Sequence, residues 1–210
     1  MLSGDLTLCQ QRWTTMSLDE FKTDLCKRLL QPRFVNSNSY EPVWFLVYDP
    51  KRTVEMAGFR RSLSKYMESQ GMTPVAFSVT DALWSALENS PSWSVIKQAD
   101  ETALDQTELM TNLFEIITNS PKENLLIDSL RSTLQSTESI HNPVLLVSGF
   151  ESLHQILRPG SIESLLSGSF VCPTLFFYPG KAEGRTGLRF LNFYEVDGNY
   201  HSEHLNIPEF

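Results

Sequence analysis

Two uninterrupted apolar runs, residues 144–147 (VLLV) and 174–178 (TLFFY), constrain the fold of this 210-residue chain more than any other feature. Neither run shows the polar alternation of a strand with one exposed face, which indicates that both faces are covered. The stretch between the two runs carries helix signals and glycine and proline punctuation. The pattern therefore predicts two buried strands that are joined by a crossover in a parallel sheet flanked by helices.

The crossover is expected to begin as a helix near Phe150 or Glu151 and to be interrupted at Arg158-Pro159-Gly160. It should resume over residues 161–166, with Gly168 as the residue that ends it. The connection is long enough to cover one face of the sheet.

Two more strands are predicted upstream, at residues 43–48 (VWFLVY) and 74–79. The helix between them should run from about Val54 to Ser69 and end at Gly71. This is a βαβ unit, so both strands are expected to be parallel members of one sheet.

Further helices are predicted from apolar residues at helical spacing. The first covers residues 17–30, with Ser17 and Glu20 as a capping box. The others are a short helix capped by Thr80 or Asp81, a helix over residues 109–117, and one that opens at Ser120-Pro121 with Glu123 and buries Leu126, Leu130 and Leu134.

The end of the chain is typical of β-hairpin strands. Residues 188–196 alternate, Asp197-Gly198 is a tight-turn dipeptide, and a last strand is expected from Asn199 to about Ile207. We therefore expect residues 17–210 to form one three-layer α/β domain, with a mostly parallel sheet flanked by helices and antiparallel strands added at one edge. Residues 1–16 should be a flexible tail.

Composition narrows the class of partner. The chain has 17 Lys and Arg residues against 25 Asp and Glu residues, and the net charge of -8 disfavours binding to nucleic acid. Cys9, Cys26 and Cys172 lack Cys-x-x-Cys spacing, so neither a disulfide framework nor a zinc site is indicated. With no apolar run of about 20 residues and no secretion signal, we expect a cytoplasmic protein that does not contact a membrane.

A phosphate-binding loop is not supported by the glycine pattern. The strand order resembles that of P-loop or Rossmann-type domains, but the turn after the first strand reads DPKRT and contains no glycine. The glycine-rich loop at residues 180–187 precedes a strand, so it has no helix N-terminus to hold phosphate. We expect a hairpin loop there.

Three polar residues, Asp49, Ser148 and Tyr178, lie at the carboxyl ends of predicted parallel strands, where open α/β sheets bind ligands. Each also has a structural explanation, as a turn former, a strand end and a core-edge aromatic. A nucleotide-binding or nuclease-like site at these strand ends therefore stays open as an alternative.

Catalytic and metal-binding motifs are otherwise lacking in the sequence. His201, Glu203 and His204 would ligate a metal only on a helix, because in a strand the two histidines, three residues apart, point to opposite faces. No Gly-x-Ser-x-Gly motif is present, and no cysteine has an evident histidine partner. We predict no catalytic residue, no cofactor and no metal.

The C-terminal strands offer the best partner-binding surface. Aromatic residues and arginines concentrate binding energy at interfaces, and this segment holds several of both: Arg185, Arg189, Phe193, Tyr194 and Tyr200. The alternative is that strand alternation sends half of these aromatic side chains into the core.

Residues 144–166 (VLLVSGFESLHQILRPGSIESLL), followed by CPTLFFYPG, GLRF and DGNY, resemble the BrxB family, the small component of bacteriophage-exclusion (BREX) defence systems. The upstream stretch WFLVYDP and the helix after it also fit, so the resemblance runs from about Ser17 to the C-terminus. The most specific pieces are Arg158 with Leu165 and Leu166, Pro173, the tetrapeptide at 177–180, and Asn199-Tyr200. After that dipeptide, family members continue with a second tyrosine and an Arg-Ala-Phe-like stretch, where this chain has HSEH. The resemblance implies a non-catalytic accessory protein of phage defence that acts beside other BREX proteins, with the phosphatase-like PglZ as the first candidate partner.

Overall fold

A parallel sheet runs through the middle of the protein in a computed structural model that describes residues 16–31, 41–89, 93–94, 97–98, 111, 125–154, 156–157, 159–184, 186–198 and 202–209. Its strand order is β2-β3-β4-β1-β7, and every neighbouring pair along that path is parallel. The strands are β1 (Val43–Tyr48), β2 (Thr73–Ser78), β3 (Pro143–Ser148), β4 (Thr174–Glu183) and β7 (Glu203–Asn206). The expected α/β fold with a mostly parallel sheet is confirmed.

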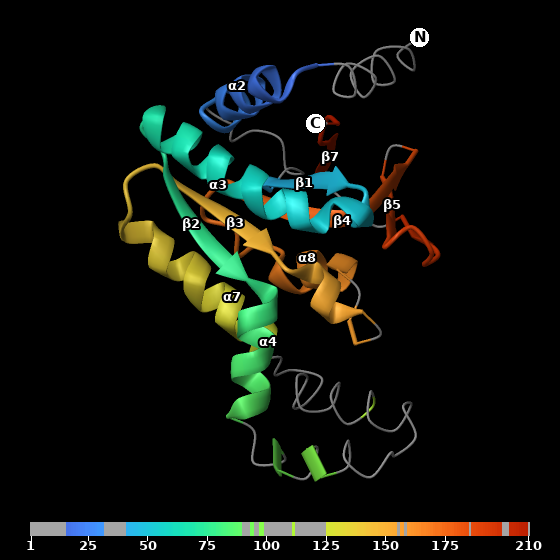
Figure 1. Cartoon of the computed structure of the whole chain (residues 1–210). Helices are drawn as coiled ribbons and strands as arrows, with labels where there is room; N and C mark the ends of the chain where they lie inside the picture. Colours follow the sequence, from blue (N-terminus) through green and yellow to red (C-terminus); the bar gives the residue numbers. More distant parts are fainter. Residues whose placement is uncertain are drawn as a thin grey trace.

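Helices cover both faces of this sheet (Figure 1). One face carries α2 (Leu18–Leu29) and α3 (Thr53–Ser69), whose buried side chains form one core cluster. The other carries α4 (Val79–Glu88), α7 (Leu125–Ser136) and α8 (Pro159–Leu166), which build a second cluster. In the part of the chain that the structure describes, the connections also contain 3-10 segments: η1 (Pro50–Arg52), η2 (Thr137–Ser139) and η3 (Phe150–Leu153).

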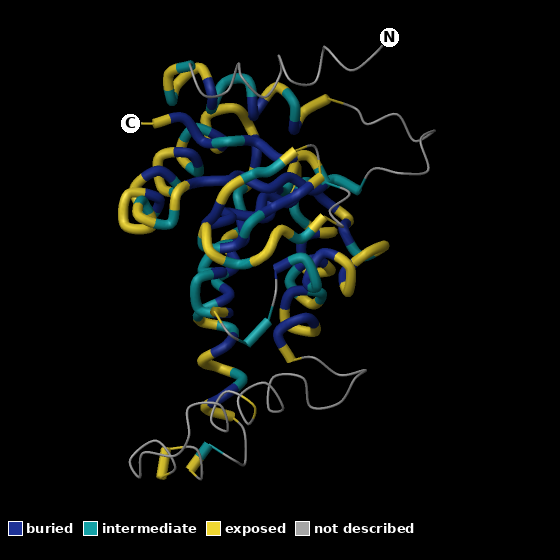
Figure 2. The backbone as a smooth tube through the Cα atoms, turned by 90° about the vertical axis from the view of Figure 1, so that its right-hand side faces the viewer, coloured by how far each residue is buried: buried dark blue, intermediate teal, exposed yellow. Residues whose placement is uncertain are grey.

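The apolar runs divide between the two clusters as strand geometry requires. All six residues of β1 are buried, and its side chains alternate, so that Phe45 packs in the α4–α7–α8 cluster and Leu46 in the α2–α3 cluster. Residues 144–147 of β3 and 175–178 of β4 follow the same rule, which is why these runs are continuously apolar. Figure 2 shows the buried residues gathered along these strands.

The helix limits follow the predicted signals, with one correction. Ser17 and Glu20 form the capping box of α2, and the left-handed Gly71 (φ 78°) follows the end of α3. The cap of α4 is Ser78, whose hydroxyl accepts from the Asp81 amide at 3.1 Å. The prediction of Thr80 or Asp81 was wrong by two to three residues, because Ser78 ends β2 and caps the helix directly.

The crossover from β3 to β4 consists of η3 followed by α8, and the helix over residues 161–166 with the left-handed Gly168 after it is confirmed. The first part is a 3-10 segment, and the predicted interruption at Pro159-Gly160 was wrong, because Pro159 is the first residue of α8, a position that tolerates its missing amide hydrogen.

The buried stripe of α7, at Leu126, Leu130 and Leu134, is also confirmed. The helix expected at 109–117, apart from Thr111, lies outside the described residues, as does the opening of the α7 helix at 120–123. The predicted tail over residues 1–15 and Arg158 of the crossover also lie outside them.

The last strand differs from the prediction. β5 (Gly187–Phe190) pairs antiparallel with the end of β4, and β6 (Val196–Asp197) pairs antiparallel with β5, so antiparallel strands are added as expected. The prediction of one strand over residues 188–196 was wrong, because Leu191 and Asn192 adopt left-handed conformations that end β5 at Phe190. β7 instead lies parallel to β1 at the far edge of the main sheet. That position buries His204 and Leu205 on opposite faces, which a solvated hairpin strand would not do.

The connections leave the strands in two directions. α3 follows β1 on one face of the sheet, whereas β5 turns back from β4 with Leu188 and Phe190 in the cluster of the opposite face. Neighbouring strands whose connections diverge in this way leave a crevice beyond their carboxyl ends. Among the described residues, no helix has the length and apolar character needed to cross a membrane.

Candidate functional site

A pocket of about 640 Å³ lies beyond the carboxyl end of β1. Its volume is in the range of small-ligand sites in proteins. Five segments of chain contribute to its walls, and the lining residues are Val47, Tyr48, Asp49, Arg52, Glu55, Gly180, Lys181, Asn192, Asn206, Ile207, Pro208 and Glu209. The pocket therefore joins the end of β1 and start of α3 to the β4–β5 hairpin and the tail after β7.

The pocket exists because β4 is longer than its neighbour β1. Tyr48, the last residue of β1, is in register with Pro179, but β4 continues to Glu183. On the other side of β1, the chain continues past β7, where the Ile207 amide donates to the Val47 carbonyl at 2.9 Å. β1 itself turns away at Asp49 into η1 and α3. The crevice is the space that a longer β1 would fill.

Asp49 occupies the place where a phosphate would bind in a nucleotide-binding α/β protein. Its carboxylate accepts from the Lys51 amide at 3.0 Å, and its carbonyl accepts from the Arg52 amide at 2.8 Å. Pro50 has no amide hydrogen. The start of η1 is thus capped by the protein's own anion, which leaves a phosphate group few backbone donors.

Both charge signs line the pocket. Arg52 donates from Nη2 to the Pro208 carbonyl at 2.9 Å and from Nε to Glu55 at 3.2 Å, so it fastens the tail after β7 to α3. Lys181 is exposed at the opposite wall. With the carboxylates of Asp49, Glu55 and Glu209, the lining suits a ligand that carries both donors and acceptors, rather than a polyanion.

A buried tyrosine braces the floor of this region. The Tyr48 hydroxyl donates to Glu151 Oε1 at 2.5 Å, and Thr53 Oγ1 donates to the same oxygen at 3.1 Å. Burial raises the pKa of Tyr48, and the negative charge of Glu151 raises it further. Tyr48 therefore keeps its proton at neutral pH and ties β1 to the segment after β3, instead of acting as a base.

Of the three strand-end residues singled out in the sequence, only Asp49 lines the pocket. Ser148 ends β3 and is partly buried. Tyr178 is fully buried and packs against Phe45 and Phe190, with ring centroids 5.6 and 5.8 Å away. Its side chain belongs to the core.

Of the predicted partner-binding residues, Arg189 stabilises the β4–β5 hairpin, whereas Phe193 and Tyr194 contribute to the surface. Arg189 makes a two-point ion pair with Glu183, at 2.7 and 3.1 Å, and donates to the Tyr194 carbonyl at 3.1 Å. Hydrogen bonding between the two partners lowers the pKa of Glu183 and raises that of Arg189. Arg189 thus holds the hairpin and the next turn together. Arg185 and Tyr200 lie outside the described residues.

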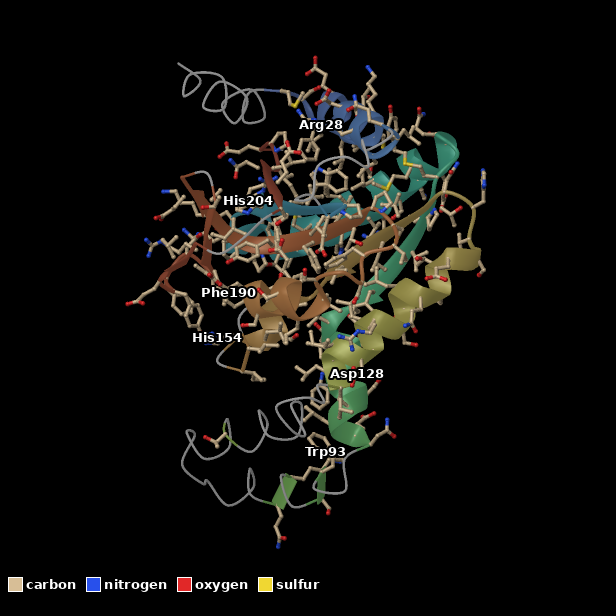
Figure 3. The ribbon with its side chains drawn as sticks, turned by 180° about the vertical axis from the view of Figure 1, so that it is seen from behind. Arg28, Trp93, Asp128, His154, Phe190 and His204 are labelled. Carbon is tan, nitrogen blue, oxygen red and sulfur yellow. The ribbon has the colours of Figure 1, made fainter. Side chains whose placement is uncertain are left out.

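Phe193 and Tyr194 form a surface with His154, which we call the aromatic patch. The Phe193 side chain is 62% exposed and stacks on Tyr194 with centroids 4.6 Å apart. The Tyr194 hydroxyl is 2.7 Å from His154 Nδ1, and the His154 ring meets Phe193 edge-on at 5.5 Å. Figure 3 shows His154 near Phe190, the buried ring on which Tyr194 stacks at 5.6 Å.

The segment at Glu203 and His204 has a structural role. Glu203 lies opposite Trp44, accepts from its indole nitrogen at 3.1 Å and pairs with Arg28 of α2, whereas His204 packs edge-on against Phe45 on the other face. His201 lies outside the described residues. Within the described part of the chain, no group of three or more His, Cys, Asp or Glu side chains is arranged to hold a metal ion.

Neither described cysteine is placed as a nucleophile. Cys26 and Cys172 are both buried thiols. Burial raises the pKa of Cys26 to about 11, so its reactive thiolate form is scarce at neutral pH.

Several site residues carry no signal in the sequence. Arg52, Glu55, Lys181 and Asn206 are brought together only by the crossing of distant segments. Comparisons with protein-family models, curated proteins and solved structures find no match to this chain.

Proposed function

We propose that the protein is a non-catalytic adaptor of a bacterial BREX phage-defence system, which acts in the cytoplasm by binding other BREX proteins. The likeness of residues 144–200 to the BrxB family supports the assignment to BREX. The observation that carries the adaptor role is the aromatic patch, because Phe193 is a large apolar side chain that is 62% exposed and yet held in place. Rigid exposed aromatic side chains concentrate binding energy at protein interfaces.

The patch is held by the turn that presents it. Leu191 and Asn192 both have left-handed backbone conformations, with φ of 51° and 66°. Such conformations cost about 1 kcal/mol or more for a residue other than glycine. The turn is fixed by the bond from the Tyr194 amide to the Phe190 carbonyl at 3.2 Å and by Arg189. Little side-chain freedom is therefore lost when a partner binds.

The first test is co-purification with PglZ. Phe193→Ala should lower recovery of PglZ at least about tenfold, as expected for loss of an interface anchor. Val171→Ala is the matched control, since Val171 is also an exposed apolar side chain (51%) but precedes β4, at the opposite end of the sheet. Thermal melting of both variants should equal that of the parent protein.

Full recovery of PglZ by folded Phe193→Ala would move the docking surface to α2. If the parent protein itself does not retain PglZ, that partner is wrong, and the other BREX proteins are tested in the same way.

The position of the pocket favours a second candidate function, a nucleotide-binding or nuclease-like protein with its site at the strand ends. Asp49, which caps η1 with its own carboxylate, argues against this candidate. Calorimetry with ATP, GTP and NAD separates the two. We expect no heat of binding, and micromolar binding of any of the three would favour the second candidate.

A further inference from the structure

We propose that the crevice ahead of β1 binds an extended peptide segment of a partner protein, which adds beside the end of β4 at Ala182, where the strand is partly exposed. This proposal rests on the adaptor function and names the chemistry of what the adaptor holds. It depends on the direction in which the backbone groups of β4 point beyond the end of β1.

Two hydrogen bonds fix that direction. The Thr174 amide donates to the Pro42 carbonyl at 2.7 Å, so even-numbered residues of β4 point their backbone groups toward β1. The Leu191 amide donates to the Pro179 carbonyl at 2.9 Å, so odd-numbered residues point toward β5. Lys181 and Glu183 pair with β5 in register. The amide and carbonyl of Ala182 therefore point to the side of β1.

β1 has already ended on that side. Its last residue, Tyr48, is opposite Pro179, and the described residues place no other strand beside the 180–183 segment there. The result is an open backbone edge in the middle of the sheet, with the tail of β7 across the crevice. Open strand edges bind extended peptides through main-chain hydrogen bonds.

The lining of the crevice suits a peptide. Asn192 and Asn206 are among its lining residues, and an asparagine amide can both donate and accept, as peptide units require. Lys181 on one wall and Glu55 on the other offer charges of both signs to the side chains of the peptide. A nucleotide lacks these matches, and Asp49 already occupies the start of η1.

The open edge is also rigid. The ion pair between Arg189 and Glu183 spans β4 and β5 and keeps the 180–183 segment extended. A preformed edge binds more tightly than one that must be ordered on binding.

Hydrogen exchange followed by NMR provides the first test on the full chain. In the unbound protein, the Ala182 amide should exchange at least about tenfold faster than the amides of Lys181 and Glu183, which point to β5. Strong protection of Ala182 in the unbound protein would overturn the proposal, because the edge would then be covered by the chain itself.

The second test uses a phage-displayed library of random peptides of about 12 residues as the probe. Peptides selected on the parent protein should slow exchange of the Ala182 amide at least about tenfold when bound. If no peptide is enriched, or if the bound peptides leave exchange of Ala182 unchanged, strand addition at β4 is wrong.

Ala182→Pro removes the amide hydrogen that the peptide needs without removing one that β5 uses, and it should weaken peptide binding at least about tenfold. Ala76→Pro is the matched control. The Thr73 amide donates to the Asn142 carbonyl, so odd-numbered residues of β2 point their backbone groups toward β3. The Ala76 amide therefore points away from β3, at the exposed edge of β2, as does the nitrogen of Pro74. Binding of the peptides by Ala182→Pro within about twofold of the control would contradict the proposal.

Lys181→Glu keeps the proposal testable if Ala182→Pro does not fold. Lys181→Glu reverses an exposed charge of the crevice wall and should change which peptides bind, whereas Lys65→Glu, at the far end of α3, should not. Identical selections on both lysine variants would contradict the proposal. The library contains no BREX protein, so a failure here is distinguishable from a failure of PglZ to co-purify.

Discussion

The fold strongly affects the ionisation of His204. It is 6% exposed, and burial lowers its pKa from 6.5 to about 4. Between these two values the unfolded chain binds a proton that the folded protein does not. The protein should therefore lose stability as pH falls from 6.5 toward 4, by up to about 3 kcal/mol from this residue alone.

His204→Leu should remove that part of the pH dependence. Urea unfolding at pH 7 and at pH 4.5 measures it, as the difference between the two free energies of unfolding. His141→Leu changes an exposed histidine and serves as the control. If His204→Leu loses as much stability on acidification as the parent protein, His204 is not the residue responsible.

Arg189 shows that residue type alone does not reveal which group a side chain binds in the fold. An arginine beside aromatic residues indicated a partner contact, but its guanidinium is paired within the hairpin and bonds to the Tyr194 carbonyl. That pairing depends on the β4–β5 register, which brings Glu183 close to Arg189. Phe193, by contrast, was predicted as a partner contact and is exposed on the surface.

The turn from β3 into η3 shows how one glycine can determine the position of an element. Gly149 has a left-handed conformation (φ 88°), and a Cβ atom there would lie 2.6 Å from Thr80 Oγ1 at the start of α4. Gly149→Ala should therefore lower the free energy of unfolding by more than the cost of backbone strain, which is about 1 kcal/mol.

Gly71→Ala isolates the steric part of this effect. Gly71 has a similar φ of 78°, but no atom lies within 4 Å of the added methyl group. Thermal and urea unfolding of the two variants should show Gly149→Ala as the less stable. Equal destabilisation would mean that contact between the β3 turn and Thr80 contributes nothing.

The positions of the strands buried on both faces were predicted because their signal is local, but β4 continues through residues 180–183, where a hairpin loop was expected. β1, β3 and β4 read as continuous apolar runs, and Gly71 and Gly168 mark helix ends by their left-handed conformations. β7 was misassigned because the tight-turn dipeptide Asp197-Gly198 indicated a hairpin between residues 188–196 and the last strand. Its true neighbour, β1, is about 160 residues earlier in the chain, so nothing near β7 in the sequence indicates parallel pairing.

The pocket depends on how distant parts of the chain are arranged. Asp49 was expected at a strand end, but the pocket also needs β4 to outlast β1 and the tail of β7 to pass Arg52. Those lengths become meaningful only once the strand order places β1 between β4 and β7. Sequence patterns gave the layers of the fold, whereas the site depends on which strands become neighbours.

A charge in the middle of the sheet should disrupt the whole protein. Leu146 is 4% exposed and lies on β3 with a strand on each side and the α2–α3 cluster above it. Leu146→Asp buries a carboxylate and should cost several kcal/mol, about enough to unfold a domain of marginal stability. A melting temperature within about two degrees of the parent protein would contradict the interior position of β3.

The two core clusters should unfold together, because they share the strands that separate them. Leu145 and Leu146 are adjacent on β3 but pack in opposite clusters. Leu145→Ala and Leu146→Ala should each lower the free energy of unfolding by about 2–5 kcal/mol.

Urea unfolding measures whether the clusters unfold together, in a background variant that keeps Trp44 as its single tryptophan. Because Trp44 lies in the α2–α3 cluster, its fluorescence reports that cluster, whereas far-UV circular dichroism reports all helices. Both signals should change at the same urea concentration in both variants, since neither helical layer can keep its buried face once the sheet has separated. If Leu145→Ala shifted the circular dichroism signal and left the Trp44 transition in place, the two layers would be independent folding units, and the expectation of a single domain would be wrong.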